Sequence, residues 1–412
     1  MHVVAYRNMN KAAVLAGFWD QLARGIPFRS WTWCRHWWNA YGDLPGRELF
    51  VVVVFDSGGW PIAIAPWYRE RDPLWGNVIR FLGTGEVCSD HLGLLCEPGM
   101  EITAAEVLAA WLVGAHDPSA NDRKDRPVYP RKAMLRFAAF GDEEDGTDDG
   151  RVLDKPLPWD MLELTGVVQD NVQVTLFVDA LREHECRVSQ EPGPNLWRIP
   201  LEKNFESYLQ RLSKNQRRNV RRRMRDHIDS GHAVLQSVSS LEMLRRGCDI
   251  LIDLHQRRRQ SLGEPGCFAS ERFRRFHLEM MPDLLRKGML GLHWVEYDGV
   301  PVAVDYQLQG AGIVYAYQAG IDPDRLDVSP GHLANLLTIR RAIEHGARVF
   351  DFLRGDERYK ADLGAVPCPT VEYRIVPPRL RPRVNLELWQ LGKRGKRLAK
   401  ATLRRWLPVA EQ

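Results

Sequence analysis

A carboxylate, a guanidinium, a phenol and an ammonium group follow one another at the end of a short apolar strand signal. The segment reads Val349-Phe350-Asp351-Phe352-Leu353-Arg354-Gly355-Asp356-Glu357-Arg358-Tyr359-Lys360. An acid inside an apolar strand is costly unless it has a partner or a task, so Asp351 is a candidate base. Beyond Gly355, Tyr359 and Lys360 could donate a proton or stabilise negative charge on a bound carbonyl. Arg354 could bind an anionic group beside them.

A purely structural role is the competing interpretation of the same residues. Asp351 could pair with Arg354, which would leave Tyr359 and Lys360 on the surface. In a regular strand, residues three apart point to opposite faces, so this simple pair is disfavoured.

Polar side chains interrupt two other apolar stretches. Asp305 and Gln307 share one face of a predicted strand, where Asp305 is either a second candidate base or part of a solvated face. Asp90 and His91 form either a substrate-binding element or a polar turn.

Ser329-Pro330-Gly331-His332 marks the start of a predicted helix after a strand and a loop. Proline suits the first helical turn, and Gly331 permits close backbone approach. Free N–H groups at such a helix start can bind phosphate. A well-capped helix without a ligand has the same pattern.

The basic charge of the chain is local. The net charge is only +4, but residues 211–225 contain eight basic residues and no acidic one. Lys214, Arg217, Arg218 and Arg221 are spaced to share one helical face. This face is a solvated surface, a site for an anionic acceptor, or a surface for nucleic acid.

Several function classes are excluded. The 412 residues contain no HExxH, GxSxG or GxxxxGK[ST] motif, and the twelve histidines lack metal-ligand spacing, so we expect no metal. No apolar run approaches the roughly 18 residues that span a bilayer. Seven scattered cysteines without a CxxC pair favour a reducing cytoplasm.

Residues 200–365 resemble the acetyltransferase domain of CelD-like proteins, which belong to the GNAT superfamily and are related to FemAB-like acyltransferases. The likeness rests on residues 212–223, the predicted hairpin 297–303, the helix start at Gly331 and, most specifically, residues 350–360. Fainter likenesses in the N-terminal half include Ser89-Asp90-His91.

The resemblance implies an α/β fold of two GNAT-like halves, with mixed central sheets flanked by helices. Residues 1–180 would form a degenerate N-terminal domain with an acidic, mobile insertion near 115–158. Residues 181–377 would form the better preserved transferase domain. Residues 378–412 would form a basic helical tail that permits peripheral association with an anionic surface.

The resemblance also implies an acetyl-CoA or other acyl-CoA co-substrate. Its pyrophosphate would lie on Ser329, Gly331, His332 and Leu333, and its acyl arm along Tyr317 and Gln318. Asp351 or Asp305 would accept the proton, Tyr359 would protonate the leaving thiolate, and Lys360 would stabilise the oxyanion. Substrate-binding residues would be Lys214, Arg217, Arg218, Arg221, Gln307, Arg354, Asp90 and His91.

We therefore expect a cytoplasmic N- or O-acyltransferase that acts on a small or carrier-linked acceptor, such as an amino sugar or an envelope or exopolysaccharide precursor. Transfer would be direct, because no cysteine has an evident base beside it. The alternatives are a FemAB-like transferase that uses aminoacyl-tRNA, or a non-catalytic protein that binds nucleic acid or another anionic ligand through residues 211–225.

Overall fold

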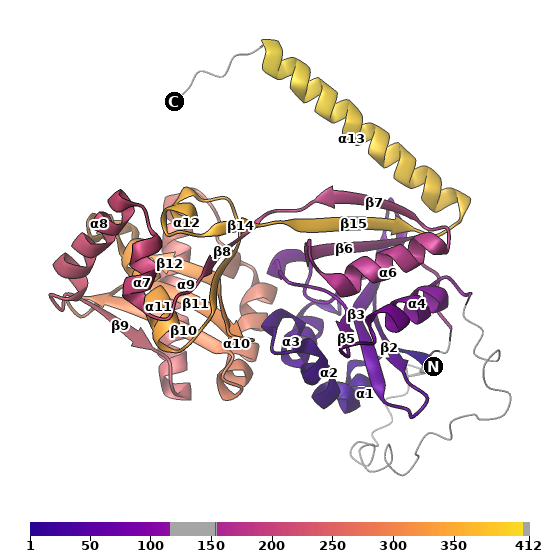
Figure 1. Ribbon diagram of the computed structural model, residues 1–412, viewed down its shortest axis with the longest axis horizontal. Helices are drawn as coiled ribbons and strands as arrows, with labels where there is room; N and C mark the ends of the chain where they lie inside the picture. The colour runs from indigo at the N-terminus through magenta and orange to yellow at the C-terminus, as the bar shows by residue number, and fades with distance from the viewer. Residues whose placement is uncertain (116–152, 154, 407–412) are drawn as a thin grey trace.

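Two mixed β-sheets lie side by side, with helices on their faces (Figure 1). The computed structural model describes residues 1–115, 153 and 155–406, with side chains described up to residue 395. The predicted insertion at 115–158, including its acidic run, therefore lies mostly outside the described residues.

The N-terminal sheet has the order β1-β2-β3-β4-β6-β15-β7, with β5 paired to β3. Its elements up to residue 183 are β1 (His2–Tyr6), α1 (Met9–Ala12), α2 (Ala16–Ala23), α3 (Trp31–Tyr41), β2 (Arg47–Phe55), β3 (Pro61–Asp72), β4 (Gly76–Phe81), β5 (Leu95–Cys96), α4 (Glu101–Leu112), β6 (Met161–Val168) and α6 (Val172–Glu183).

The C-terminal sheet has the order β14-β8-β13-β12-β11-β10-β9. Its strands and helices are β8 (Leu196–Pro200), α7 (Phe205–Arg211), α8 (Lys214–Arg223), a π-helical turn η4 (Met224–Ile228), β9 (Ala233–Ser237), α9 (Leu241–Ser261), α10 (Glu271–Arg286), β10 (Leu290–Tyr297), β11 (Val300–Gly310), β12 (Ile313–Ile321), α11 (Pro330–Glu344), β13 (Val349–Arg354), α12 (Arg358–Asp362) and β14 (Val366–Cys368).

A strand from the end of the C-terminal half belongs to the N-terminal sheet. After the N-terminal half, β7 (Arg187–Pro192) adds to its sheet edge, and β15 (Thr370–Val376) returns from the C-terminal half to pair between β6 and β7. The sheets are thus not divided at the expected boundary after residue 180. The chain continues into α13 (Leu380–Trp406), and no helix in the described part of the chain is long and apolar enough to cross a membrane.

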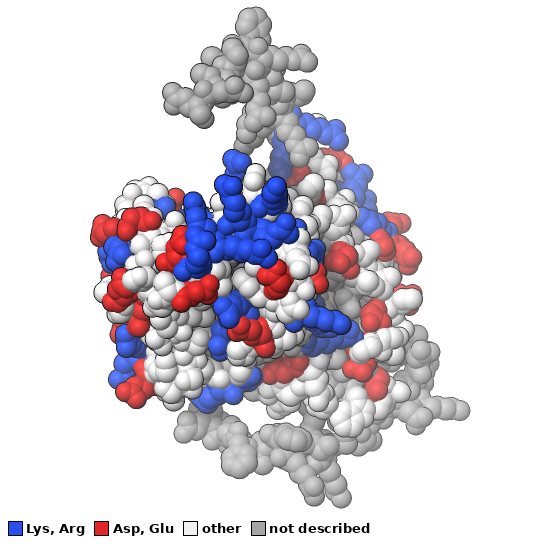
Figure 2. Space-filling model, turned by 60° about the vertical axis from the view of Figure 1, so that its left-hand side comes forward, with Lys and Arg blue, Asp and Glu red and all other residues white. Residues whose placement is uncertain are grey.

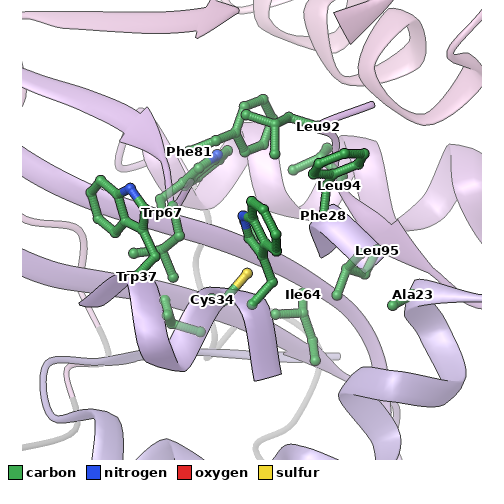
Figure 3. Close-up of a cluster of buried hydrophobic side chains, with 14 of the residues drawn as sticks. Ala23, Phe28, Cys34, Trp37, Ile64, Trp67, Phe81, Leu92, Leu94 and Leu95 are labelled. Carbon is green, nitrogen blue, oxygen red and sulfur yellow. The ribbon is translucent and has the colours of Figure 1, made fainter. Parts of the chain in front are cut away.

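An aromatic core in the N-terminal half fixes the loop that faces the other half. Phe28, Trp37, Trp67 and Phe81 pack together with small aliphatic side chains (Figure 3). The indole N–H of Trp37 donates to the Thr84 carbonyl at 3.1 Å, and that of Trp33 donates to Ser89 Oγ at 2.9 Å. Burying these rings without a partner for each N–H would be unfavourable, so the core holds residues 84–89 in place.

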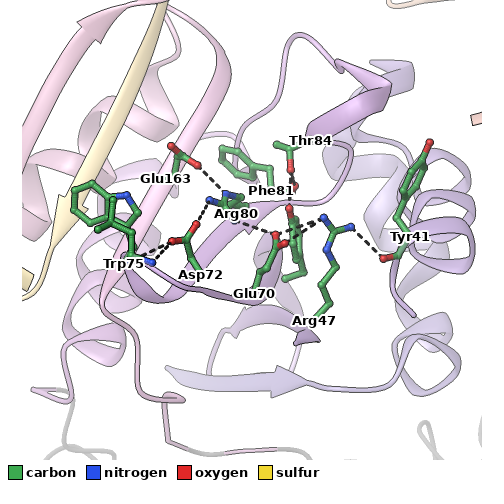
Figure 4. Close-up of polar contacts among 11 residues, drawn as sticks. Tyr41, Arg47, Glu70, Asp72, Trp75, Arg80, Phe81, Thr84 and Glu163 are labelled. Carbon is green, nitrogen blue, oxygen red and sulfur yellow. Dashed lines mark hydrogen bonds and ion pairs between the residues drawn. The ribbon is translucent and has the colours of Figure 1, made fainter. Parts of the chain in front are cut away.

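A polar network joins β2, β3, β4 and β6 within the same sheet (Figure 4). Arg80 donates to Glu163 at 2.7 Å and to Glu70 at 2.9 Å, and Arg47 reaches Glu70 at 3.5 Å. These pairs bridge neighbouring strands, as cross-strand pairs of opposite charge do.

Asp351 of β13 is the centre of a buried joint between the halves. Its side chain is fully buried and accepts from Arg198 Nε of β8 at 2.7 Å and from His91 Nε2 of the N-terminal half at 3.0 Å. Because Arg198 Nη2 also donates to His91 Nδ1 at 3.1 Å, the ring proton of His91 lies on Nε2. Burial alone would raise the pKa of Asp351, but the hydrogen bond from the His91 N–H, together with the charge and hydrogen bond of Arg198, holds that pKa below its usual range.

A second ion pair crosses the same boundary. Arg354 Nη2 donates to Asp90 Oδ1 at 2.6 Å, and Arg354 Nε donates to the same oxygen at 3.0 Å. The Asp351–Arg354 pair considered from the sequence is therefore not formed. The strand does not stay regular as far as Arg354, because Leu353 has a φ of 57°, and Arg354 binds Asp90 instead. Asp90 and His91 are both buried, and each binds one of the charged residues of β13.

We expect Asp351→Asn to destabilise the protein by about 3 kcal/mol at pH 7, because it leaves the guanidinium of Arg198 without its counter-charge. Urea unfolding measures this difference. Since the folded-state pKa of Asp351 is depressed, the stabilisation is present above about pH 4 and is lost as the pH falls below that value.

Asp356→Asn is the matched control, because exposed Asp356 accepts only from Trp197 Nε1 at 3.0 Å and the amide oxygen can replace it. We expect it to change stability by less than about 0.5 kcal/mol. Equal stability of the Asp351→Asn protein and this control would contradict a joint centred on Asp351.

Candidate functional site

A cavity of about 690 Å³ opens where two parallel strands separate. β12 and β13 pair only over residues 313–315 and 349–351. Beyond this point, residues 316–321 of β12 and 352–354 of β13 both line the cavity, and the starts of α11 and α12 contribute further lining residues. The edge of β12 that faces β13 thus has no partner strand along the cavity.

Asp351 also shapes this separation. Its Oδ1 accepts the N–H of Leu353 at 2.8 Å, and Leu353 has a φ of 57°, in the left-handed region that leucine rarely adopts. The register with β8 shifts at the same place, between Asp351 and Arg354. The side chain of Asp351 therefore stabilises a bend that ends the pairing of β13 and turns Arg354 towards Asp90.

The start of α11 forms one wall of the cavity. Ser329 is in the left-handed region with a φ of 53°, and no side chain caps the helix. The N–H groups of His332 and Leu333 both donate to the Ser329 carbonyl, at 3.0 and 3.2 Å. In the described part of the chain no acceptor is recorded for the Gly331 N–H, and a Cβ at Gly331 would meet only Ile321 Cγ2, at 3.5 Å.

Asp305 of β11 lies in the cavity wall and is almost completely buried. Burial raises its pKa to about 6, although a hydrogen bond of 3.3 Å from the Thr338 hydroxyl partly opposes the shift. A carboxyl group that is poised near neutral pH and faces a cavity is suited to general-base catalysis.

Tyr359 of α12 also lines the cavity, and its ring packs edge-on against Phe352. Burial raises the pKa of its phenol above the ordinary value, as do the nearby charges of Glu357 and Asp305. The phenol therefore stays protonated at neutral pH and can donate a proton.

The ammonium group of Lys360 is already fully engaged. Its Nζ donates to the carbonyls of Arg354 and Gly355 at 2.9 and 3.0 Å and pairs with Glu357 at 2.9 Å. An ammonium group has three N–H donors, so none is left over for an oxyanion in this arrangement. Although Lys360 lines the cavity, its bonds stabilise the loop between β13 and α12.

The remaining predicted residues divide into two groups. Tyr317, Gln318, Ser329, Gly331, His332, Asp90 and Arg354 line the cavity together with Asp305, Tyr359 and Lys360. Asp351, Leu333, His91, Gln307, Lys214, Arg217, Arg218 and Arg221 do not line it. Asp351 is thus a positioning residue rather than the proton acceptor that we considered, because it is sealed between His91 and Arg198.

The hydroxyl of Tyr317 already has hydrogen-bond partners in the protein. It donates to the Val87 carbonyl at 2.7 Å and lies 3.2 Å from His277 Nε2. Tyr317 is also the extra residue in a β-bulge, since Tyr306 pairs with Gln318 and Gln307 pairs with Ala316. The bulge turns the neighbouring residues of β12 along the cavity.

Two cavity residues were missed by the sequence analysis. Arg258 and Arg259, near the end of α9, line the cavity opposite β13. Arg259 pairs with Glu264 at 2.8 Å, whereas no partner is recorded for the Arg258 side chain among the described residues. The run Arg257-Arg258-Arg259 was a usable signal for an anionic ligand.

A cysteine does have a base beside it, contrary to our expectation. Cys267 Sγ lies 3.2 Å from His255 Nε2, and His255 Nδ1 donates to the Ala319 carbonyl at 2.9 Å. Burial, however, raises the pKa of Cys267 to about 12 and lowers that of His255. The thiol therefore stays protonated, and this pair does not supply a nucleophile.

The basic side chains of α8 lie outside the cavity, on the surface of the C-terminal half (Figure 2). Arg221 pairs with Glu206, and Arg217 donates to the Gln210 carbonyl at 3.4 Å. Gln216 donates to Asp362 of α12 at 3.3 Å, which keeps α8 close to the cavity rim. In the chain as described, no group of three or more His, Cys, Asp or Glu side chains could hold a metal ion.

Comparison with protein families supports the C-terminal assignment. Residues 214–361, which include most residues of the cavity lining, match the family described as an acetyltransferase (GNAT) domain. A search of curated proteins found no significant match.

Known structures resemble the whole chain. The crystal structure of FemX has a TM-score of 0.58 and 12% identity over 91% of this chain and 98% of FemX. The C-terminal domain of a putative lysylphosphatidylglycerol synthetase from Agrobacterium fabrum has a TM-score of 0.50 and 9% identity over 93% of this chain and 95% of that domain. A conserved protein from Bacteroides thetaiotaomicron also scores 0.50, at 9% identity over 90% of this chain and 97% of that protein. These likenesses confirm the predicted fold of two GNAT-like halves, and the C-terminal half has a GNAT-type acyltransferase fold.

Proposed function

We propose that the protein is an acyl-CoA-dependent N- or O-acyltransferase, with acetyl-CoA as the first donor to test. The observation that carries the proposal is the cavity between β12 and β13. It brings together a helix start with a free N–H, an unpaired strand edge, a carboxyl group with a pKa of about 6 and a protonated phenol.

The residues of the cavity fit a phosphorylated thioester. The Gly331 N–H and the side chain of Arg258 can contact phosphate oxygens, because both lack a recorded partner in the described structure. The free edge of β12 at residues 316–319 offers backbone groups to an extended acyl arm. An acyl-CoA supplies the activated carbonyl.

Transfer needs one base and one acid. The acceptor's amine or hydroxyl attacks the thioester carbonyl, a C–N or C–O bond forms, and the C–S bond breaks. Asp305 accepts the proton lost by the acceptor, and Tyr359 donates a proton to the departing thiolate. Arg354 and Lys360 act by holding the loop that presents Tyr359.

For the acceptor, we propose an amino sugar or an envelope or exopolysaccharide precursor, free or linked to a carrier, modified in the cytoplasm. The CelD-like motif in residues 350–360 and the FemX-like fold support this class. The carboxyl group of Asp305 in the cavity wall, which is ionised above about pH 6, would favour an amine over an anionic acceptor.

A second candidate is a transferase that uses aminoacyl-tRNA. The basic residues of α8 favour it, because they spread over an exposed surface near the cavity rim instead of converging inside. An extended polyanion that binds along α8 could place its end in the cavity. A non-catalytic protein could bind a ligand on the same surface, but that role would not explain why the Asp305 carboxyl, with its raised pKa, faces the cavity.

We expect Asp305→Asn to abolish at least 99% of turnover while making the protein more stable. In the wild type, kcat/KM should rise with pH around 6 as Asp305 ionises, and the variant should lack this rise. Thiol release from acetyl-CoA, measured with a panel of amino sugars, tests the rate.

The sign of the stability change in Asp305→Asn follows from the raised pKa of Asp305. In the folded protein the Asp305 carboxyl keeps its proton up to about pH 6, so its ionisation lowers the free energy of unfolding as the pH rises from about 4 to 6. Removing this carboxyl should therefore raise the free energy of unfolding by about 1–3 kcal/mol at pH 7.5 and leave it unchanged below pH 4. Thr338→Val, which removes a hydrogen bond to the carboxylate, should move the rate inflection to higher pH. An Asp305→Asn protein that is less stable and still active would place the base elsewhere.

Gly331→Asp should weaken CoA binding at least tenfold, or about 1.4 kcal/mol, because it adds a negative charge beside the expected phosphate. Isothermal titration with CoA measures the affinity. Gly331→Asn is the neutral control of the same size. It should lose less CoA affinity than Gly331→Asp, since a Cβ at this position meets only Ile321. Equal CoA affinity in folded Gly331→Asp would place the donor elsewhere and favour the second candidate.

Replacing Lys214, Arg217, Arg218 and Arg221 by Gln tests the surface of α8. If α8 binds a polyanion, tRNA affinity should fall at least tenfold and its salt dependence should flatten, because fewer phosphate contacts are made. The melting temperature should change little, since the Arg221–Glu206 pair is more than half exposed on both sides. A control that also removes four charges substitutes Arg182, Arg274, Arg286 and Arg340 by Gln. Equal tRNA affinity in the two variants would exclude α8 as the binding surface.

A further inference from the structure

One face of α13 attaches this helix to the N-terminal sheet. Leu386 is buried in a cluster with Val78, Met161 and Val376. Trp389 packs against Trp75 with ring centroids 6.3 Å apart, and the guanidinium of Arg374 lies 4.5 Å from the Trp389 ring. These contacts fix the rotation of the helix about its own axis.

The opposite face is an apolar stripe exposed to solvent. Leu380, Val384, Leu388 and Leu391 are 81%, 42%, 62% and 59% exposed. Their spacing of four, four and three residues places them within about one quarter of the helical circumference. Leu386 and Trp389 lie on the other side of the helix, so the stripe points away from the body of the protein.

The charge around this stripe has one sign. Residues 379–405 contain ten Lys or Arg and a single acidic residue, Glu387. On a helical wheel of residues 379–395, Arg381 lies on one side of the apolar stripe, and Arg383 and Arg394 lie on the other side. α13 also extends beyond the sheet to which its first turns are attached (Figure 1), and the stripe on those first turns is accessible because its side chains are exposed.

We propose that α13 binds the surface of a bilayer rich in anionic lipid, lying parallel to it with the stripe at Leu388 and Leu391 in contact with the acyl-chain boundary. A helix with an apolar face and an otherwise basic surface fits this partner, because the apolar residues leave water while the cations meet lipid phosphates. A second copy of the chain fits less well, since pairing two such stripes would bring two sets of ten basic residues together. The helix would then hold the cavity close to a membrane, where lipid-linked acceptors lie.

The test is flotation of the full-length protein with phosphatidylcholine vesicles that contain or lack 30% phosphatidylglycerol. We expect binding to the anionic vesicles, at least tenfold weaker binding to the neutral ones, and release by 0.5 M salt. Leu388→Asp/Leu391→Asp should reduce binding to anionic vesicles at least tenfold. The control Ile102→Asp/Leu241→Asp should bind as wild type does, because these residues are equally exposed, at 61% and 59%, on other helices.

Circular dichroism checks that both double variants keep their fold, which is expected since all four side chains are exposed. Wild-type protein that stays unbound with anionic vesicles at low salt would overturn the proposal. So would equal binding by the Leu388/Leu391 variant, or a dimer in sedimentation that this variant dissociates while vesicle binding is absent.

Discussion

The architecture of the site depends on the hydrogen-bond donors that surround one buried carboxylate, that of Asp351. Asp351 lies in the centre of the C-terminal sheet, where an ionised acid is unfavourable unless donors surround it. Its donors come from β8, from the backbone of Leu353 and from His91 in the other half. Meeting this requirement bends β13, ends its pairing with β12 and brings the two halves together.

Asp305 and Asp351 show how environment separates two acids of the same type. Asp351 has a guanidinium and an imidazole N–H in contact, so its charge is stabilised and its pKa is lowered. Among the described residues, Asp305 has one long hydrogen bond, from a hydroxyl, so burial raises its pKa. The well-paired acid is therefore suited to holding structure, and the poorly paired one to exchanging protons.

The N-terminal half contributes to the site by positioning residues beside β13. Its tryptophans bind the loop at residues 84–89, and that loop presents Asp90 and His91 to β13. The return of β15 into the N-terminal sheet adds a backbone connection to this side-chain joint.

Local features of the sequence were enough to predict the strand that carries Asp351, the helix start at Gly331 and the face of Asp305. Strand alternation and helix-start preferences depend on residues that are close in the chain, so they can be found without the fold. The order of these elements also indicated an α/β domain, and the family resemblance implied a fold of two halves. Only the tertiary structure decided which acid is paired, that Lys360 is fully bonded, that Cys267 lies beside His255 and that β15 joins the other sheet. Those outcomes depend on partners up to 260 residues away, such as His91 for Asp351, because charge, burial and packing act through space rather than along the chain.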